Sequence, residues 1–244
     1  MRIAVVSDVH ANLAALEAVL RHAEASGAVD GVWCLGDIVG YGPEPGEVIA
    51  ELRRRALAAV AGNHDRAACG LMDIDDFNPS AASAVLWTAA QLAAEDRDFL
   101  ALLPLTRVEG AFTLVHGSLR APEWEYLLTP EQAEAQLARQ ETPYSLIGHS
   151  HLQLRFEERP GREPELVEAR DGDCVELGAT RLILNPGGCG QPRDGDPRAP
   201  YALYDEGTGT FTWHRVAYEI GATQAKMRDA GLDPWLIDRL ALGR

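Results

Sequence analysis

The first half of the chain alternates short apolar runs with longer amphipathic stretches. One such stretch places Leu13, Leu16 and Ala23 on a single helical face and ends at Gly27, a residue typical of helix termini. This alternation is typical of βαβ units and predicts a largely parallel sheet. Strands are expected at residues 3–6, 32–35 and 57–61, and helices at residues 11–26 and 44–55.

The middle of the chain changes pattern. Residues 66–104 are expected to form a mainly helical insertion, with a loop at 71–79 and Ser80 as a helix N-cap. This insertion is predicted to roof a site formed by the preceding turns. Two further strands are expected at 112–115 and 145–147, separated by a helix that begins after Thr129 and Pro130.

Beyond His151 the pattern becomes mostly strand-like, with turns rich in glycine and proline. The shift from βαβ units to consecutive strands predicts two sheets rather than one, in an α/β fold. No long linker or repeat interrupts the chain, so residues 1–244 are expected to form a single domain that ends in one or two helices. The strands are expected at 152–156, 165–169, 182–184, 201–204 and 211–216, and the helices within 221–242.

Composition excludes several classes of protein. The chain has 244 residues, of which 46% are hydrophobic and 24% charged, as in ordinary globular proteins with a large core. Its net charge of −15 argues against a dedicated nucleic-acid-binding surface, because such surfaces draw their affinity from Lys and Arg. The four cysteines form no C-x-x-C pair, so neither a zinc finger nor a disulfide framework is expected.

The distribution of apolar residues also indicates where in the cell the protein is expected. Asp8 and His10 interrupt the apolar N-terminal run before the core of a signal peptide could form. No apolar run approaches the roughly 18 residues that a membrane span requires. We therefore expect a cytoplasmic protein without membrane association.

The candidate metal-binding residues lie directly after predicted strands. In five segments a strand-like run is followed by side chains able to bind a metal, beside a glycine or another small residue. Because the carboxyl ends of parallel strands open on one edge of a sheet, these five ends are expected to meet. Five of the seven histidines fall in them. The segments are Ser7-Asp8-Val9-His10, Leu35-Gly36-Asp37, Ala61-Gly62-Asn63-His64-Asp65, Val115-His116-Gly117 and Ile147-Gly148-His149-Ser150-His151.

Local spacing suggests how these side chains are aimed. In an extended chain residues i and i+2 point the same way, so Asp8 with His10, and His149 with His151, are each expected to converge on one point. Adjacent residues diverge, and Asn63 and His64 should therefore face different targets.

Together the five segments match the pattern D-x-H, G-D, G-N-H-D/E, V-H-G and G-H-x-H, in that order, over residues 7–151. In this the sequence resembles the calcineurin-like metallophosphoesterases, and in particular their small prokaryotic phosphodiesterase branch. The resemblance implies a four-layer α/β/β/α sandwich of two mixed sheets flanked by helices. This agrees with the two sheets expected from the pattern.

The resemblance also implies a dinuclear metal site. Asp8, His10, His151 and a shared Asp37 would hold one cation, and Asp37, Asn63, His116 and His149 would hold the other. Oxygen and imidazole donors without thiolate suit two divalent ions such as Mn, Fe, Zn or Ni. Such a pair could share a hydroxide, which would act as the nucleophile on a phosphoester.

Three further residues in or near these motifs have expected roles in catalysis or in local structure. The resemblance makes His64 the general acid that protonates the leaving group, and Asp65 would hold its imidazole in orientation. Asp65 could instead be a turn residue or helix N-cap. Asn12 is expected either near the metal edge or as the cap of the first helix.

A stretch dense in glycine and proline spans residues 185–198. It resembles the N-P-G-S and Q-P-R-D-G-D-P-R segment of one prokaryotic branch of the family, although Gly188 stands where serine is common. Arg193 could project from it toward a substrate phosphate, or could belong to an Arg and Asp network that rigidifies the loop. Phe77, Asn78 and Trp87 are candidates for the roof of the pocket, with core packing favoured for Trp87.

Three functions compete. Gly36-Asp37 is not followed by the arginine of the protein phosphatases, so a phosphodiesterase is favoured, with a phosphomonoesterase as the alternative. A third possibility is a scaffold like the retromer subunit of this fold, although a scaffold needs neither His64 nor complete ligands. The expected partner is a small phosphoester, with nucleotides among the candidates, and the C-terminal helices could pair in a homo-oligomer.

Overall fold

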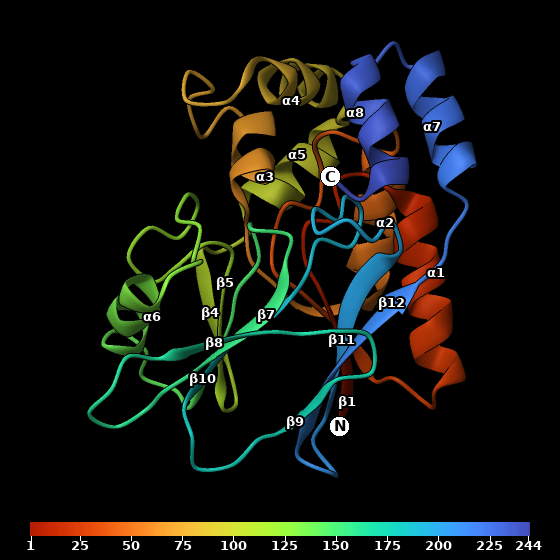
Figure 1. The fold of residues 1–244 in the computed structure, drawn as a ribbon. Helices are drawn as coiled ribbons and strands as arrows, with labels where there is room; N and C mark the ends of the chain where they lie inside the picture. Colours follow the sequence, from red (N-terminus) through yellow and green to blue (C-terminus); the bar gives the residue numbers. More distant parts are fainter.

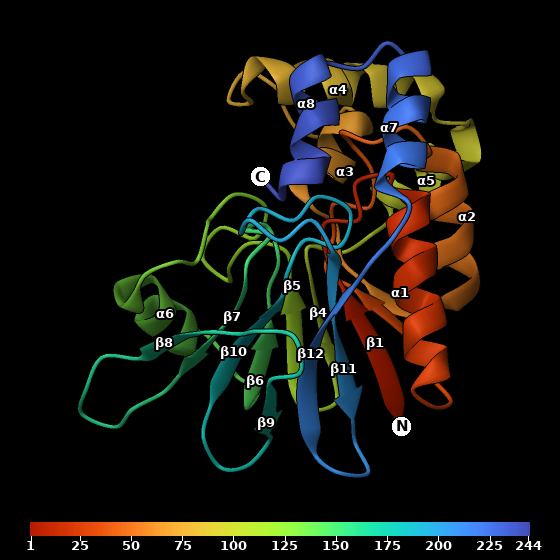
Figure 2. The same ribbon diagram turned by 45° about the vertical axis from the view of Figure 1, so that its right-hand side comes forward.

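A computed structural model describes residues 1–244 and contains two six-stranded mixed sheets. Figures 1 and 2 show the sheets side by side in the lower part of the molecule, with helices outside them and above them. The α/β class and the two-sheet arrangement expected from the sequence are therefore confirmed.

The first sheet begins with three parallel strands, β1 (Arg2–Val6), β2 (Gly31–Cys34) and β3 (Ala56–Ala59). It continues from β1 through the antiparallel strands β11 (Ala199–Asp205), β12 (Thr210–Val216) and β9 (Cys174–Glu176). Helices α1 (Leu13–Ala25) and α2 (Pro45–Arg55) connect the parallel strands. Their apolar faces bury against one side of this sheet, and the residues in contact include Leu16, Val19, Ile49, Leu52, Ala4 and Val6.

The second sheet has the strand order β4-β5-β6-β10-β7-β8. Its central strands β5 (Phe112–Val115), β6 (Tyr144–Leu146) and β10 (Leu182–Pro186) run parallel to one another. Helix α6 (Pro130–Leu137) packs on its outer face, where Ala133 and Leu137 contact Ile147 and Phe156. The remaining strands are β4 (Thr106–Glu109), β7 (Gln153–Glu157) and β8 (Glu165–Glu168).

Between the sheets lies an apolar layer to which both contribute. Val5 and Trp33 of the first sheet meet Leu114, Leu146 and Leu184 of the second. Burial of these side chains on both faces explains why the central strands read as continuous apolar runs rather than as alternating patterns. The layers are thus helix, sheet, sheet and helix, as the resemblance implied.

Three helices follow β3 and include the predicted insertion: α3 (Asn63–Ala68), α4 (Pro79–Gln91) and α5 (Ala94–Ala101). The chain ends in α7 (Ile220–Asp229), α8 (Pro234–Arg239) and the short 3-10 helix η1 (Leu240–Leu242). Helices α4, α7 and α8 lie together above the sheets (Figures 1 and 2). Trp87 packs in the apolar cluster that joins α4 to the C-terminal helices. It therefore has the core role that the sequence favoured.

One local expectation was wrong, and two strands were not predicted. Asn78, not Ser80, caps α4, because its side chain accepts the Ala81 N–H and Pro79 then occupies the first turn. Strands β4 and β9 were not expected, because their side chains are mostly exposed and carry no apolar alternation. None of the helices combines the length and the apolar character that crossing a bilayer requires.

Candidate active site

The ends of six strands meet at one edge of the two sheets. Asp8 follows β1, Asp37 follows β2 and Asn63 follows β3, while His116 follows β5 and His149 follows β6. The sixth strand, β10, leads into the glycine-rich loop, and an isolated parallel bridge between Ser7 and Gly188 joins it to the end of β1. The predicted convergence of strand ends is therefore what the structure contains.

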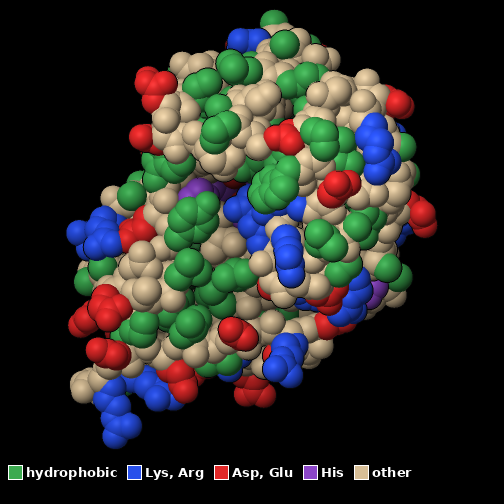
Figure 3. Space-filling model, turned by 45° about the horizontal axis from the view of Figure 1, so that its top comes forward, with side chains coloured by type: hydrophobic (Ala, Val, Ile, Leu, Met, Phe, Trp, Pro, Cys, Tyr) green, Lys and Arg blue, Asp and Glu red, His purple; other side chains and the backbone are tan.

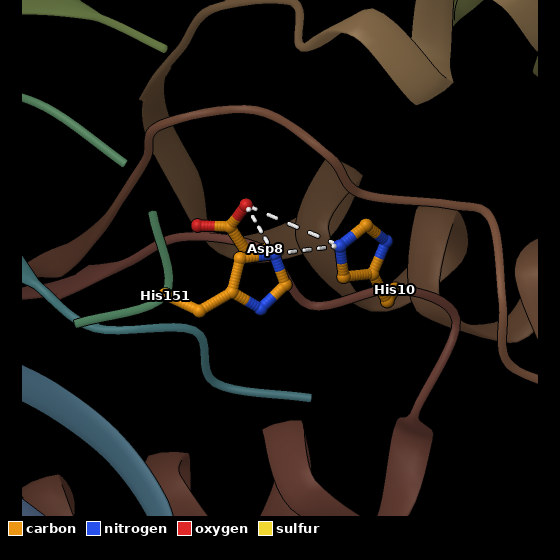
Figure 4. A group of neighbouring side chains, drawn as sticks. All are labelled: Asp8, His10 and His151. Carbon is orange, nitrogen blue, oxygen red and sulfur yellow. Dashed lines mark hydrogen bonds and ion pairs between the residues drawn. The ribbon is translucent and has the colours of Figure 1, made fainter. Parts of the chain in front are cut away.

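Asp8, His10 and His151 form the first cluster (Figure 4). The Nε2 atom of His151 lies 3.2 Å from Asp8 Oδ1, and His10 Nε2 lies 4.0 Å from the same oxygen. The two Nε2 atoms are 3.3 Å apart. All three side chains are buried, so these donor atoms face a common point that bulk water does not surround.

Asp37, His116 and His149 form the second cluster. His116 Nε2 lies 3.4 Å from Asp37 Oδ2 and 3.2 Å from His149 Nδ1. Asp37 Oδ2 is also 3.6 Å from His10 Nε2, so this carboxylate stands between the two clusters. Asn63 lies in the same pocket, and its Oδ1 is buried without a hydrogen-bond partner.

These residues fit two divalent cations. Four histidines hold one ring nitrogen against a backbone carbonyl oxygen: His10 against Val39, His116 against Leu35, His149 against Trp124 and His151 against Gln191, at 2.6 to 3.1 Å. Each carbonyl requires an N–H donor, so the other nitrogen is the one that offers a lone pair when the ring is neutral. Pairs of such nitrogens then face each other at 3.2 to 3.3 Å, an arrangement that a shared cation relieves.

The backbone at these ligands is not extended. Asp8, His10, Asp37, His149 and His151 all have φ between 48° and 63°, in the left-handed region that non-glycine residues seldom occupy. The expectation that residues i and i+2 converge from an extended chain was therefore wrong in its mechanism. Asp8 and His10 do share one cluster, but His149 and His151 belong to different clusters. Strain of this kind gathers at functional sites, where the surrounding structure holds it in place.

Gly62 shows how closely the loops are packed. A Cβ atom at this position would lie 2.1 Å from Asp37 Oδ1 and 2.4 Å from the Asp37 backbone nitrogen. Since that space is needed for the carboxylate between the clusters, only glycine can precede Asn63 here without moving Asp37.

Burial and charge shift the pKa values of these groups in opposite directions. Burial lowers the pKa of His149 to about 3 and that of His64 to about 4, so both imidazoles are neutral at neutral pH. Burial would also lower the pKa of His116, but the Asp37 carboxylate overrides it and raises that pKa to about 9. Burial raises the pKa of Asp8 to about 6.

Loading with cations is therefore expected to displace a proton. At about pH 8 His116 is protonated in the metal-free protein, and a cation can bind its Nε2 only after that proton has left. We expect His116 to contribute about one proton per chain at about pH 8 and less at higher pH, and this contribution should make the apparent affinity rise with pH up to about 9. Titration calorimetry in two buffers of different ionisation enthalpy measures this number.

Two measurements test the prediction that cation binding releases the His116 proton. The His116→Gln protein has no imidazole to discharge, so its proton release should be lower by about one proton per chain under the same conditions. If the unaltered protein released no proton at about pH 8, His116 would not be a ligand of the cations.

Asp65 does not have the predicted role of orienting His64. Its Oδ1 accepts the Val39 N–H at 3.1 Å and its Oδ2 accepts the Gly62 N–H at 3.0 Å. Both oxygens therefore fasten the loop and the first turn of α3, while the Nδ1 atom of His64 has no partner. This is the turn and capping role that the sequence left open.

Asn12 caps the first helix. Its Oδ1 accepts the Ala15 N–H at 3.2 Å, and its Nδ2 donates to the Gly190 carbonyl at 2.8 Å and to the Tyr218 hydroxyl at 3.2 Å. Asn12 thus ties the loop that carries His10 to the glycine-rich loop and to the C-terminal segment. It does not line the pocket.

A pocket of about 490 Å³ opens above the clusters. Figure 3 shows histidine at the bottom of a hollow between the helical upper part and the sheets, with basic side chains beside it. Arg193 and His64 line it, as do the predicted roof residues Phe77 and Asn78. Sequence reasoning missed the other lining residues, which are Tyr41, Asp76, Ala81, Trp124 and Tyr126. The aromatic residues at positions 124 and 126, shortly after the V-H-G motif, were a usable signal.

Arg193 stands apart from the ionic network of its own loop. That network is formed by Arg198 with Asp196 and by Arg215 with Asp194. Arg193 instead donates to Gln191 Oε1 at 2.9 Å and lies 5.8 Å from the centre of the Tyr41 ring, with its Nε buried and unpaired. Its charge is therefore free to meet an anion in the pocket.

Comparison with known proteins agrees with this geometry. The profile of the calcineurin-like phosphoesterase superfamily domain matches residues 1–209. An uncharacterized protein from Methanocaldococcus jannaschii is 36% identical over 247 residues, covering 99% of this chain and 98% of the relative. The crystal structure of a metallophosphoesterase from Sphaerobacter thermophilus matches with a TM-score of 0.90 at 46% identity, over 100% of this chain and 99% of that chain. A hypothetical protein from Pyrococcus horikoshii shares the fold, with a TM-score of 0.80 at 21% identity over 100% and 98% of the two chains.

Proposed function

Since this chain belongs to the calcineurin-like phosphoesterase superfamily, we propose that it is a metal-dependent hydrolase that acts on phosphodiesters. The observation that carries the proposal is the pair of buried donor clusters with Asp37 between them, open to a pocket that Arg193 and His64 line. When bound, two divalent cations would lower the pKa of a water molecule between them and polarise the phosphoryl oxygens.

The chain's own residues then position the substrate. Asp8, His10 and His151 would hold one cation, His116, His149 and Asn63 the other, and Asp37 both. Arg193 would bind a non-bridging phosphate oxygen, because its guanidinium has no carboxylate partner in the structure. These contacts orient the phosphoester for in-line displacement.

His64 would supply a proton to the oxygen of the leaving group. Its backbone N–H donates to Asp37 Oδ1 at 2.9 Å, and its ring lies between those of Tyr41 and Phe77, which fixes it beside the clusters. Burial keeps its pKa near 4 in the free protein. A bound anionic phosphoester raises the pKa of an adjacent imidazole, so substrate and proton should arrive together.

The charges of the pocket favour a diester over a monoester. Arg193 is the one basic residue among the side chains that line it, and Asp76 adds a negative charge. A diester carries one negative charge and two organic groups, whereas a monoester presents a dianion, which Asp76 repels more strongly. The volume of about 490 Å³ leaves space for a second substituent.

The test is hydrolysis of bis(p-nitrophenyl) phosphate beside p-nitrophenyl phosphate, after removal of metals and their return one at a time. We expect Mn²⁺, Ni²⁺ or Zn²⁺ to restore turnover, with the diester hydrolysed at least about tenfold faster by kcat/KM. Preference for the monoester would favour a phosphatase. No turnover with any cation, at two bound per chain, would overturn the enzyme proposal in favour of a scaffold.

A further inference from the structure

The lining of the pocket has two chemically different parts. One part consists of the residues of the metal clusters, other polar side chains and Arg193. The other part includes three aromatic rings and one carboxylate. These are Phe77, Trp124 and Tyr126, here called the aromatic wall, and Asp76. A phosphate and its cations account for the first part but not for the second.

The aromatic wall is joined directly to the catalytic groups. Tyr126 stacks on the ring of His149 with centroids 4.1 Å apart, and Trp124 accepts a hydrogen bond from His149 Nε2 through its carbonyl. Phe77 meets Trp124 edge to face at 5.0 Å and His64 at 5.1 Å. The wall is therefore fixed in position relative to the reacting phosphate.

Part of the wall is open to solvent. The exposed fraction is 37% for Trp124 and 43% for Tyr126, high values for aromatic residues that line a pocket. Exposed aromatic surface at the rim of a site is typical of ligand binding. A planar ring of the substrate could stack there and remove this surface from water.

Asp76 limits what that ring can be. Neither Asp76 nor Arg193 takes part in any ion pair of the structure. An unpaired carboxylate in the lining repels a second phosphate. It accepts hydrogen bonds, and so it suits a ring that carries N–H donors on its edge.

We propose that the aromatic wall and Asp76 form a subsite for the base of a nucleoside phosphoester. The ring of the base stacks on the wall, an amino group on its edge donates to Asp76, and the phosphate lies at Arg193 and the metal clusters. This inference rests on the proposed function for the placement of the phosphate. It adds the substrate class and the residues that select it.

A quaternary ammonium group is the other ligand that aromatic rings and a carboxylate attract. It requires ring faces that surround the cation. Phe77 and Trp124 instead pack edge to face against each other at an interplanar angle of 72°, and one face of Tyr126 is covered by His149 at 21°. Because His149 covers one face of Tyr126, that face is closed to a cation, whereas the exposed edge and remaining face of the wall can still contact a flat ring.

Three phosphate esters separate the contributions of ring and amine. AMP has both, purine riboside 5′-monophosphate has the ring without the exocyclic amine, and ribose 5-phosphate has neither. Each is measured as a competitive inhibitor of bis(p-nitrophenyl) phosphate hydrolysis by the metal-loaded protein. We expect the inhibition constant of AMP to be about 5- to 100-fold below that of ribose 5-phosphate, with purine riboside 5′-monophosphate between them.

Two variants locate the contacts. Trp124→Leu should reduce the advantage of AMP over ribose 5-phosphate by at least about fivefold. Asp76→Ala should remove the difference between AMP and purine riboside 5′-monophosphate. Matched controls are Trp235→Leu, an exposed tryptophan of α8 away from the pocket, and Asp75→Ala, the exposed neighbour of Asp76; both should leave the ratios within about twofold.

The outcomes are distinguishable. Equal inhibition by AMP and ribose 5-phosphate would overturn the base subsite while leaving the hydrolase proposal intact. Phosphocholine that binds as tightly as AMP, and loses affinity in the same two variants, would overturn it in favour of an ammonium site. If no cation restores hydrolysis, the proposed function fails, and direct calorimetric titration of the same three esters still decides whether the base is recognised.

Discussion

The Asp37→Asn protein is expected to bind both cations at least about 100-fold more weakly and to lose at least about 10³-fold in metal-dependent phosphodiesterase activity. Asp37 is the side chain between the two clusters, 3.4 Å from His116 Nε2 and 3.6 Å from His10 Nε2. Asparagine keeps the shape but removes the negative charge that both cations would share. No neighbouring carboxylate can replace it for the second cluster, whose other members are imidazoles.

The fold should survive this substitution. Asp37 Oδ1 accepts the His64 backbone N–H at 2.9 Å, and the amide oxygen of asparagine can accept the same bond. Metal content by elemental analysis, far-UV circular dichroism and kcat/KM are measured together, with Asp75→Asn as an exposed carboxylate control. If metal content stayed unchanged in the Asp37→Asn protein, Asp37 would not be the shared ligand.

The convergence of the ligand segments could be predicted from the sequence because it depends on topology. Short apolar runs indicated the parallel strands β1, β2, β3, β5 and β6, and parallel strands place their carboxyl ends together. Polar residues directly after such runs were therefore expected to meet within each sheet, and the packing of the two sheets brings the two groups together. The inference within a sheet required the order of the elements but no side-chain geometry.

What escaped prediction depends on contacts between segments distant in sequence. The left-handed backbone of Asp8 and His149 arises from packing of loops around them, which no local pattern records. Asp65 faces the N–H groups of Val39 and Gly62 rather than His64, a choice that is settled only when two loops meet. The aromatic wall was missed for the same reason, since Trp124 and Phe77 come into contact only in the folded protein.

His64→Gln is expected to slow the hydrolysis of substrates with poor leaving groups far more than that of substrates with good ones. Diphenyl phosphate, whose phenol departs reluctantly, should lose about 10²–10⁴-fold in kcat/KM because its oxygen needs a proton as the bond breaks. Bis(p-nitrophenyl) phosphate should lose about tenfold or less, because p-nitrophenolate is stable without one. The plot of rate against leaving-group pKa should steepen accordingly.

This comparison also separates two roles that the geometry of His64 permits. His64 forms a group with His10 and Asp37 in which one donor atom of each lies within 4.8 Å of the others, so it could bind a cation instead of protonating the leaving group. An acid can be removed without loss of metal, whereas removal of a ligand lowers metal content and slows all substrates alike. His214→Gln, a partly buried histidine beside His22 and outside the pocket, is the matched control. Equal losses on both diesters together with reduced metal content would make His64 a ligand, and the leaving group would then have to obtain its proton from water.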